Sequence, residues 1–546
     1  MWKKILFVFV GFIVIASTLV WFNRIEILLH LATERSQQRQ IAGNQDIRWQ
    51  SGDAIQSDQP NIVMIVMDDM GINDVSTYGG GMIPTPNIDK LAAQGAIFTN
   101  GYSAHANCAP ARAAMMTGRD STRTGYDVTP TPKNMGRMIV TIANSDLRDR
   151  PKAIYYPEAD KANPDFENRG LPGQELTIAE VLKKAGYRTL HIGKWHLGRN
   201  QTMNPNAQGF DESLMMGSGL YLPIEHPEAV NGFVDSSAID RFLWAGMNYA
   251  VVWNNGPWFE PKGYLTDYFS NQAERAIEAN SNRPFFLYLA HWGPHNPIQA
   301  TRSDYQAVGD ITPHHKRVYA AMLYSLDRSV GNIMAKLEQQ GLSENTIVVL
   351  TSDNGGADYV AIDDLNKPYR GWKNTFFEGG IRVPYTIRWP GKIAPGTTID
   401  EPVIHYDLMP TLAAAAGVDL PSDRDYDGVD LAPLWSQDDK AFTRNNDAMF
   451  WSTGSYRAVQ QSGWKLQLNP ASGQEFLYNL NVDPTEKNNL IATETDKLAS
   501  LRSLIDEHFA NAVEPVAQSI LLAPVSIDKS GEKWFEQDDE YIMWNN

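Results

Sequence analysis

Continuous apolar runs, separated by helical patterns, most constrain the fold of this 546-residue chain. Three such runs cover residues 61–67, 285–289 and 346–350, and a fourth, alternating run covers 187–192. Continuous runs of this length are typical of parallel strands that are buried on both faces. Amphipathic helical patterns lie between them, over 265–279 and 316–340. This alternation predicts an α/β fold with a mixed, mostly parallel sheet sandwiched by helices.

The pattern changes from about residue 440 onward. Short alternating runs follow, and then a helical pattern over 494–510. Alternation is typical of antiparallel strands with one exposed face. We therefore expect a main domain over 59–440 and, over 441–546, a small C-terminal α+β subdomain with an antiparallel sheet, followed by a tail.

The N-terminus carries an export signal. Residues 5–22 are uncharged and mostly apolar, and two lysines precede them. Eighteen residues are nearly enough to span a bilayer and are long for the apolar part of a signal peptide. Residues 1–23 are thus expected to be a signal anchor rather than a cleaved signal peptide, with 24–58 as a polar stalk or linker. The body would be exported, to the periplasm or the outside, and would stay anchored to the membrane where this segment is not cleaved.

The net charge of −17 argues against a nucleic-acid partner, which would leave a basic footprint. It does not argue against a small anionic substrate, because local cations decide that affinity. The single cysteine also excludes a disulfide framework within the chain.

Ionisable residues follow the end of each predicted strand. They are Asp68 and Asp69, Lys194 and His196, His295, and Asp353 with Asn354. Ligands of open α/β sheets bind beyond the carboxyl ends of the strands. Adjacent carboxylates at the end of a core strand are costly unless a cation or hydrogen bonds compensate them. We therefore expect these residues to meet in one site.

Cys108 is the only cysteine in the sequence, and it opens the segment Cys108-Ala-Pro-Ala-Arg112. Pro110 suits the first turn of a helix, and the residues after it are good helix formers. Cys108 is therefore expected at a helix N-terminus, with Arg112 one turn along the same side. A thiol in that place is expected to be acidified and exposed. The alternative is a small, buried hydrophobic residue.

The candidate site combines oxygen ligands with fixed cations. Three carboxylates and an amide oxygen form a hard site that suits Ca²⁺ or Mg²⁺ better than zinc. A dication and several cationic side chains around a nucleophile stabilise a developing oxyanion. The cationic or titratable residues are Arg112, Lys194, His196, His295 and Lys373. This chemistry suits the transfer of a tetrahedral anion such as sulfate or phosphate.

The Cys108 segment, read on to Thr117-Gly118, resembles the signature of the type I sulfatases, in which the cysteine is converted to formylglycine. The chain is similar to that family over most of residues 60–490. The further motifs are Asp68-Asp69-Met-Gly, Gly193-Lys-Trp-His-Leu-Gly198, Pro294-His-Asn-Pro297, Ser352-Asp-Asn-Gly355, Lys373 with Glu378-Gly-Gly-Ile-Arg-Val-Pro384, and Leu477-Tyr-Asn-Leu with Asp483-Pro-Thr-Glu486. The resemblance implies an arylsulfatase-like enzyme with the alkaline-phosphatase-like fold, a catalytic domain over 59–440, and one bound Ca²⁺ in preference to Mg²⁺.

The resemblance also implies a role for each candidate residue. The metal ligands would be Asp68, Asp69, Asp353, Asn354 and the modified Cys108. The hydrated formylglycine would attack sulfur and form a covalent sulfate ester. Lys373 and His295 would hold the leaving-group side of the sulfate. Lys194, His196 and Arg112 would orient the hydrate and assist its collapse. The implied partners are a formylglycine-generating enzyme, or an equivalent maturase, and a sulfated small molecule or polysaccharide.

Two other functions use the same residues. One is a phosphodiesterase or phosphonate monoester hydrolase of the same superfamily, and the other is a non-catalytic protein that captures sulfated ligands. The sulfate ester itself stays open between a sulfated carbohydrate and an aryl sulfate.

Two segments, 127–172 and 200–265, look like insertions and are expected to form the walls of the site. The second is rich in aromatic residues. At least one of Trp244, Trp253 and Trp258 is expected to line the pocket.

Overall fold

The computed structural model describes residues 24–145, 148–436, 442–444 and 447–546. The apolar segment 5–22, predicted as a signal anchor, lies outside these ranges. Among the helices within them, none is long and apolar enough to cross a bilayer.

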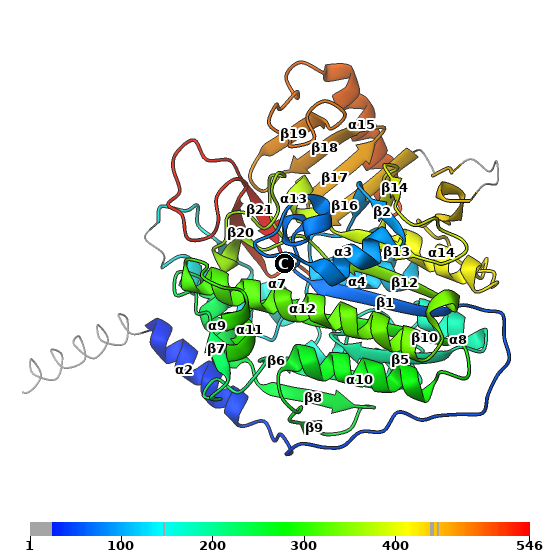
Figure 1. Cartoon of the computed structure of the whole chain (residues 1–546). Helices are drawn as coiled ribbons and strands as arrows, with labels where there is room; N and C mark the ends of the chain where they lie inside the picture. The colour runs from blue at the N-terminus through cyan, green and yellow to red at the C-terminus, as the bar shows by residue number, and fades with distance from the viewer. Residues whose placement is uncertain (1–23, 146–147, 437–441, 445–446) are drawn as a thin grey trace, which may run out of the picture.

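The main sheet has ten strands in the order β14-β2-β13-β12-β1-β10-β5-β6-β8-β9 (Figure 1). Their bounds are β1 (Asn61–Asp68), β2 (Ala96–Phe98), β5 (Arg188–Gly193), β6 (Glu212–Gly219), β8 (Tyr249–Trp253), β9 (Trp258–Phe259), β10 (Phe285–Pro294), β12 (Thr346–Ser352), β13 (Tyr385–Arg388) and β14 (Thr397–Ile399). The five central strands, from β12 to β6, are parallel. Three further pairs are antiparallel: β13 with β12, β8 with β6, and β9 with β8. The predicted mixed, mostly parallel sheet is confirmed.

The register of the central strands brings their carboxyl ends to one edge. Val66 of β1 pairs with Ala290 of β10 and with Thr351 of β12, and Ala290 pairs with Gly193 of β5. The residues that follow these four strands therefore emerge side by side.

Helices cover both faces of the sheet. Residues 63, 65 and 67 of β1 pack on one face, under α3 (Pro86–Ala93), α10 (Leu265–Ala279) and α12 (His314–Gln339). Residues 62, 64 and 66 pack on the other, where α4 (Cys108–Thr117), α8 (Ile178–Lys184) and α14 (Leu408–Ala415) lie. Since every side chain of β1 is buried, its sequence is continuously apolar instead of alternating.

A second sheet, four-stranded and antiparallel, lies in the C-terminal part of the chain. It consists of β16 (Ala448–Thr453), β17 (Tyr456–Gln461), β18 (Trp464–Asn469) and β19 (Gln474–Asn479). The helix α15 (Thr495–Phe509) packs on β17 and β18. This agrees with the α+β subdomain expected from the alternating pattern.

The predicted stalk packs on the body instead of standing free of it. It begins with the helix α2 (Arg24–Gln37), which lies against α9 (Ala238–Gly246). Further on, Ile47 and Trp49 are buried, and the ring of Trp49 meets that of Trp253 edge-on at 4.8 Å. Residues 24–58, predicted as a polar stalk or linker, thus contribute two apolar side chains to the core.

The two predicted insertions contain regular structure. Residues 127–172 hold α6 (Met135–Ala143), β4 (Ile154–Tyr155) and α7 (Pro157–Ala162). Residues 200–265 supply β6, β8 and β9 of the main sheet itself. The tail, which had no predicted place, forms β20 (Leu521–Ser526) and β21 (Tyr541–Asn545), which make a three-stranded sheet with β4.

Candidate functional site

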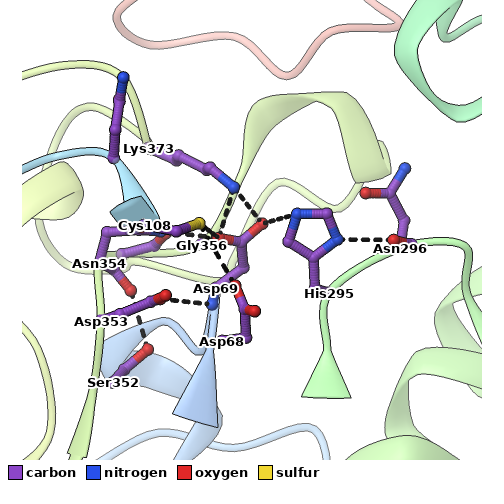
Figure 2. A network of polar contacts seen from close by, with 12 residues as sticks. Asp68, Asp69, Cys108, His295, Asn296, Ser352, Asp353, Asn354, Gly356 and Lys373 are labelled. Carbon is purple, nitrogen blue, oxygen red and sulfur yellow. Dashed lines mark hydrogen bonds and ion pairs between the residues drawn. The ribbon is translucent and has the colours of Figure 1, made fainter. Parts of the chain in front are cut away.

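The carboxylates of the site stand where two neighbouring strands end. Asp68 closes β1, and Asp69 follows it with a φ of 62°, a left-handed conformation that few residues other than glycine adopt. Asp353 and Asn354 follow β12 directly. The backbone N–H of Asp69 donates to Asp353 Oδ1 at 3.2 Å, and this bond joins the ends of β1 and β12. All four side chains are buried (Figure 2).

Cys108 is the first residue of α4, as expected, and its Sγ faces the carboxylates. It lies 3.4 Å from Asp68 Oδ1 and 3.6 Å from Asp69 Oδ1. However, the residue is only 2% exposed, and burial together with the carboxylates raises the pKa of the thiol well above its usual range. The expectation of an acidified, exposed thiol is therefore wrong. Loss of water and two close negative charges outweigh the helix end and the nearby cations.

Each carboxylate has a cationic partner. Lys194 Nζ lies 2.5 Å from Asp68 Oδ2, and Lys373 Nζ lies 2.7 Å from Asp69 Oδ1. Arg112 binds Asp353 through Nε and Nη2, each 2.8 Å from Oδ2. Three negative and three positive side chains thus balance in a buried space, and a bound dication would leave the site positive for an anionic substrate.

Burial and the neighbouring charges shift the pKa values of several of these residues. Burial raises the pKa of Asp68, against the opposing effect of Lys194. Burial also opposes the charge on Lys373, but the neighbouring carboxylate of Asp69 raises the pKa of that lysine well above its usual range. Burial would raise the pKa of Asp353, yet Arg112 holds it below the ordinary value.

Two histidines, His196 and His295, lie in the same space. Both are neutral, because burial lowers the pKa of each well below the usual range. His295 Nδ1 lies 2.6 Å from the carbonyl oxygen of Asn296, so this nitrogen carries the proton. Its Nε2 then presents a lone pair toward Asp69 Oδ2, 3.5 Å away. Figure 2 shows Lys373 and His295 both pointing at Asp69. The buried Nδ1 of His196 has no hydrogen-bond partner among the described residues.

The structure therefore brings together every residue that the sequence placed in the site. One cluster whose ligand atoms all lie within 4.8 Å of one another joins Asp68, Asp69 and Cys108 with His295. Asp353 and Asn354 adjoin it through Asp69, since Asn354 Nδ2 donates to Asp69 Oδ1 at 2.8 Å.

Sequence reasoning missed two aromatic residues of this site. The Tyr359 hydroxyl donates to Asp69 Oδ2 at 3.2 Å. The ring of Trp292 stacks on His295 with centroids 4.0 Å apart, and Lys194 Nζ lies 4.7 Å from the same ring. Trp292 lies three residues before His295, so a search of that strand exit could have found it, whereas nothing in the sequence marks Tyr359.

The prediction that at least one of Trp244, Trp253 and Trp258 lines the pocket finds no support at Trp253 or Trp258. Trp253 and Trp258 belong to β8 and β9, three and four strands away from β10. Trp253 meets Trp49, and Trp258 lies under the guanidinium of Arg39 at 4.0 Å. Both rings thus contact the N-terminal segment. Trp244, on α9, packs against Phe233 with ring centroids 4.4 Å apart.

Known proteins share this sequence and architecture. The sequence model of the Sulfatase family matches residues 60–418, and that of the N-sulphoglucosamine sulphohydrolase C-terminal region matches residues 370–512. The N-acetylgalactosamine-6-sulfatase of Rattus norvegicus is 33% identical over 449 residues, which cover 80% of this chain and 77% of that protein. The steryl-sulfatase of the same species is 29% identical over 501 residues, which cover 80% of this chain and 79% of that protein.

A solved structure shows that the similarity extends to the fold. The crystal structure of Ps i-CgsB in complex with k-i-k-neocarrahexaose aligns with a TM-score of 0.68 and 28% identity, covering 84% of this chain and 94% of that one. The family match over two thirds of the chain and the shared fold lead to one conclusion: the chain belongs to the sulfatase family and is a sulfuric ester hydrolase.

Proposed function

We propose that this sulfatase removes sulfate from a carbohydrate, with a nucleophile generated at position 108. The observation that carries the proposal is the charge-balanced ring of carboxylates and cations around Cys108. Two similar proteins carry sugars in their names, N-acetylgalactosamine-6-sulfatase and the complex with k-i-k-neocarrahexaose, which favours a sulfated sugar over a simple aryl sulfate.

The donor set fits a calcium ion. The five proposed ligands are Asp68, Asp69, Asp353, Asn354 and the modified Cys108. All of them offer oxygen, the ligand that Ca²⁺ prefers, and Ca²⁺ tolerates irregular geometry better than Mg²⁺ does. The buried Oδ1 of Asn354 has no hydrogen-bond partner among the described residues, so this oxygen is available to a cation. When bound, the ion would neutralise sulfate oxygens and polarise the ester.

Cys108 is proposed as the site of formylglycine, made by a separate maturase. In its hydrated form this group would supply an oxygen nucleophile where a thiol is poorly ionised. Its place at the first position of α4 lets free backbone N–H groups stabilise negative charge there.

The remaining residues divide between binding the sulfate and moving a proton. Lys373 and His295, which meet at Asp69, would hold the sulfate on the leaving-group side, His295 once its Nε2 has taken up a proton. Lys194 would orient the nucleophile from the Asp68 side, with Arg112 behind it. The buried Nδ1 of His196 has no hydrogen-bond partner among the described residues, so this residue would exchange a proton with the nucleophile at that atom.

A substrate panel tests this proposal. It contains 4-nitrophenyl sulfate, 4-nitrophenyl phosphate, a diester of phosphate, and sulfated oligosaccharides that include k-i-k-neocarrahexaose and galactosamine-6-sulfate chains. We expect the sulfate esters to be turned over far faster than the phosphate esters, and Cys108→Ala to abolish turnover without loss of the fold. Mass spectrometry of residues 102–112 should show an aldehyde or its hydrate. A plain thiol in fully active enzyme would contradict the nucleophile, and equal rates on phosphate diesters would favour the phosphodiesterase.

Export also remains a proposal. It rests on the apolar segment 5–22, and membrane fractionation of the full chain tests it. Release by detergent but not by salt would support an anchor. A soluble protein that begins near residue 23 would support a cleaved signal peptide.

A further inference from the structure

The rim of the site is built from segments that are far apart in the sequence. The short helix η5 (Asp358–Val360) carries Tyr359, whose hydroxyl reaches Asp69. The backbone N–H of Gly531, in the C-terminal tail, donates to the carbonyl oxygen of Asp358 at 2.8 Å. The tail loop between β20 and β21 therefore lies one side-chain length from a carboxylate of the site.

Arg148 ties this tail loop to the segment that leads into α9. Its guanidinium donates to the carbonyl oxygens of Gly531 at 2.6 Å and of Ser236 at 2.7 Å. Its own carbonyl oxygen accepts from the N–H of Phe535 at 3.1 Å. On the other side, Asp240 of α9 accepts from Asn296 Nδ2 at 3.0 Å, beside His295. Both segments thus border the site and are held to each other.

Each of these two segments exposes a large aromatic ring. Trp534 is 63% exposed and Phe233 is 50% exposed. Their surroundings are nevertheless held in place: Lys533 pairs with Asp363 at 2.9 Å, and Phe535 packs against Tyr541. Phe233 itself rests on Trp244.

A single exposed ring needs no explanation, since surfaces of proteins commonly carry them. Two rings on segments that are held to each other, and that each contact a neighbour of a site residue, are a different observation. Covering them would remove apolar surface from water at no cost in ordering the backbone. An aromatic ring also stacks on flat apolar faces such as the C–H face of a pyranose.

We propose that Trp534 and Phe233 form an aromatic platform that stacks on a sugar ring of the substrate, remote from the reacting sulfate. This inference rests on the proposed carbohydrate substrate and adds the residues that would recognise it. Binding energy from a remote sugar would be lost with the platform, while a minimal aryl sulfate never reaches it.

Kinetics of Trp534→Ala, Phe233→Ala and the double variant test the platform. Each is compared on 4-nitrophenyl sulfate and on the sulfated oligosaccharide that the parent enzyme turns over best. Stacking of one ring contributes about 0.5–1.5 kcal/mol, so we expect KM for the oligosaccharide to rise about two- to tenfold for each ring. The parameters for 4-nitrophenyl sulfate and the melting temperature should stay at the parent values, and Trp534→Phe should keep most of the affinity.

Tyr324→Ala is the matched control, because Tyr324 is an exposed ring on α12. It should change neither substrate's KM. Parent values of KM for the oligosaccharide in the double variant would overturn the platform and leave the proposed function intact. Equal losses on both substrates would also overturn it, because they would show a structural role. An enzyme that cleaves 4-nitrophenyl sulfate but no sulfated oligosaccharide would overturn both the platform and the carbohydrate substrate.

Discussion

Individual residues of the site are held by opposite charges that are largely buried. Arg112, Lys194 and Lys373 each compensate a carboxylate that follows a core strand. Their positions in the sequence predicted that they would meet, because the carboxyl ends of parallel strands share an edge. The degree of burial was not predictable from the sequence. It depends on how Tyr359, Trp292 and the tail close over the strand exits, and these contacts come from distant parts of the chain.

Arg112 offers the sharpest test of this charge balance. It is fully buried and faces both Asp353 and Asp68. We expect Arg112→Met to lower the free energy of unfolding by about 3–5 kcal/mol, because it leaves buried carboxylates without a partner. Urea unfolding measures the change, with the exposed Arg137→Met as control. Equal stability of both variants would mean that the carboxylates are compensated by other groups.

Asp74 predicts a pH dependence of stability. Its Oδ2 accepts from the Tyr319 hydroxyl at 2.7 Å and from the Gly71 N–H at 2.9 Å, and burial raises its pKa to about 8. The folded protein therefore keeps a proton on Asp74 that the unfolded chain has already released above about pH 4. Asp74 thus lowers the stability as pH rises from about 4 to 8.

Asp74→Asn should remove this part of the slope, since an amide keeps the accepting oxygen and never ionises. Unfolding free energies at pH 5, 6, 7 and 8 compare the variant with the parent and with the exposed Asp165→Asn. An unchanged slope in Asp74→Asn would show that this carboxyl titrates normally.

At the scale of elements, the sequence predicted best those that are buried on both faces. β1, β10 and β12 lie where the apolar runs are, and α10 has the predicted bounds of residues 265–279. Thr177 and Glu180 form a capping box at the start of α8, a pattern that the sequence itself carries. Strands β6, β8 and β9 were hidden inside an apparent insertion, although they pair with β5 and with one another, which are close in the sequence. The tail sheet was hidden because β20 pairs with β4 across more than 360 residues.

One buried ion cluster joins the C-terminal sheet to the helix after Lys373. Lys465 of β18 lies 2.9 Å from Glu378 of α13 (Glu378–Ile381) and 2.9 Å from Glu486. We expect Lys465→Met to destabilise the protein by about 3–5 kcal/mol, because two carboxylates then lose their shared cation. Thermal and urea unfolding measure the loss, with the exposed Lys487→Met as control. A variant as stable as this control would show that Arg382, which also binds Glu378, is sufficient.

At the scale of the whole molecule, the fold class and the family followed from the sequence, whereas the rim did not. Motif residues lie at strand ends, where topology alone brings them together. The rim is made by α9, η5 and the tail loop, whose contacts involve single backbone groups such as those of Gly531 and Asp358. Such contacts leave no periodic pattern in the sequence.

Metal removal gives a prediction for the molecule as a whole. Because cations already balance the carboxylates, we expect dialysis against EDTA to abolish turnover and lower the melting temperature, while the far-UV circular dichroism at 25 °C stays unchanged. A ligand at a hundred times its Kd stabilises the folded state by about 2.7 kcal/mol, so added Ca²⁺ should raise the melting temperature in a concentration-dependent way. Asp353→Asn should need more Ca²⁺ for the same rise. Full activity of metal-free protein would contradict the calcium site.

The burial of Cys108 sets an order of events in the life of the protein. A thiol that is 2% exposed, at the first position of a helix and facing two carboxylates, cannot be reached by another enzyme once the chain has folded. The proposed maturase would therefore have to act on the nascent or unfolded chain, and modification and folding would compete for the same short interval. Any molecule that folded first would keep its thiol. Slower folding, or slower export, would leave a larger share of the chains active.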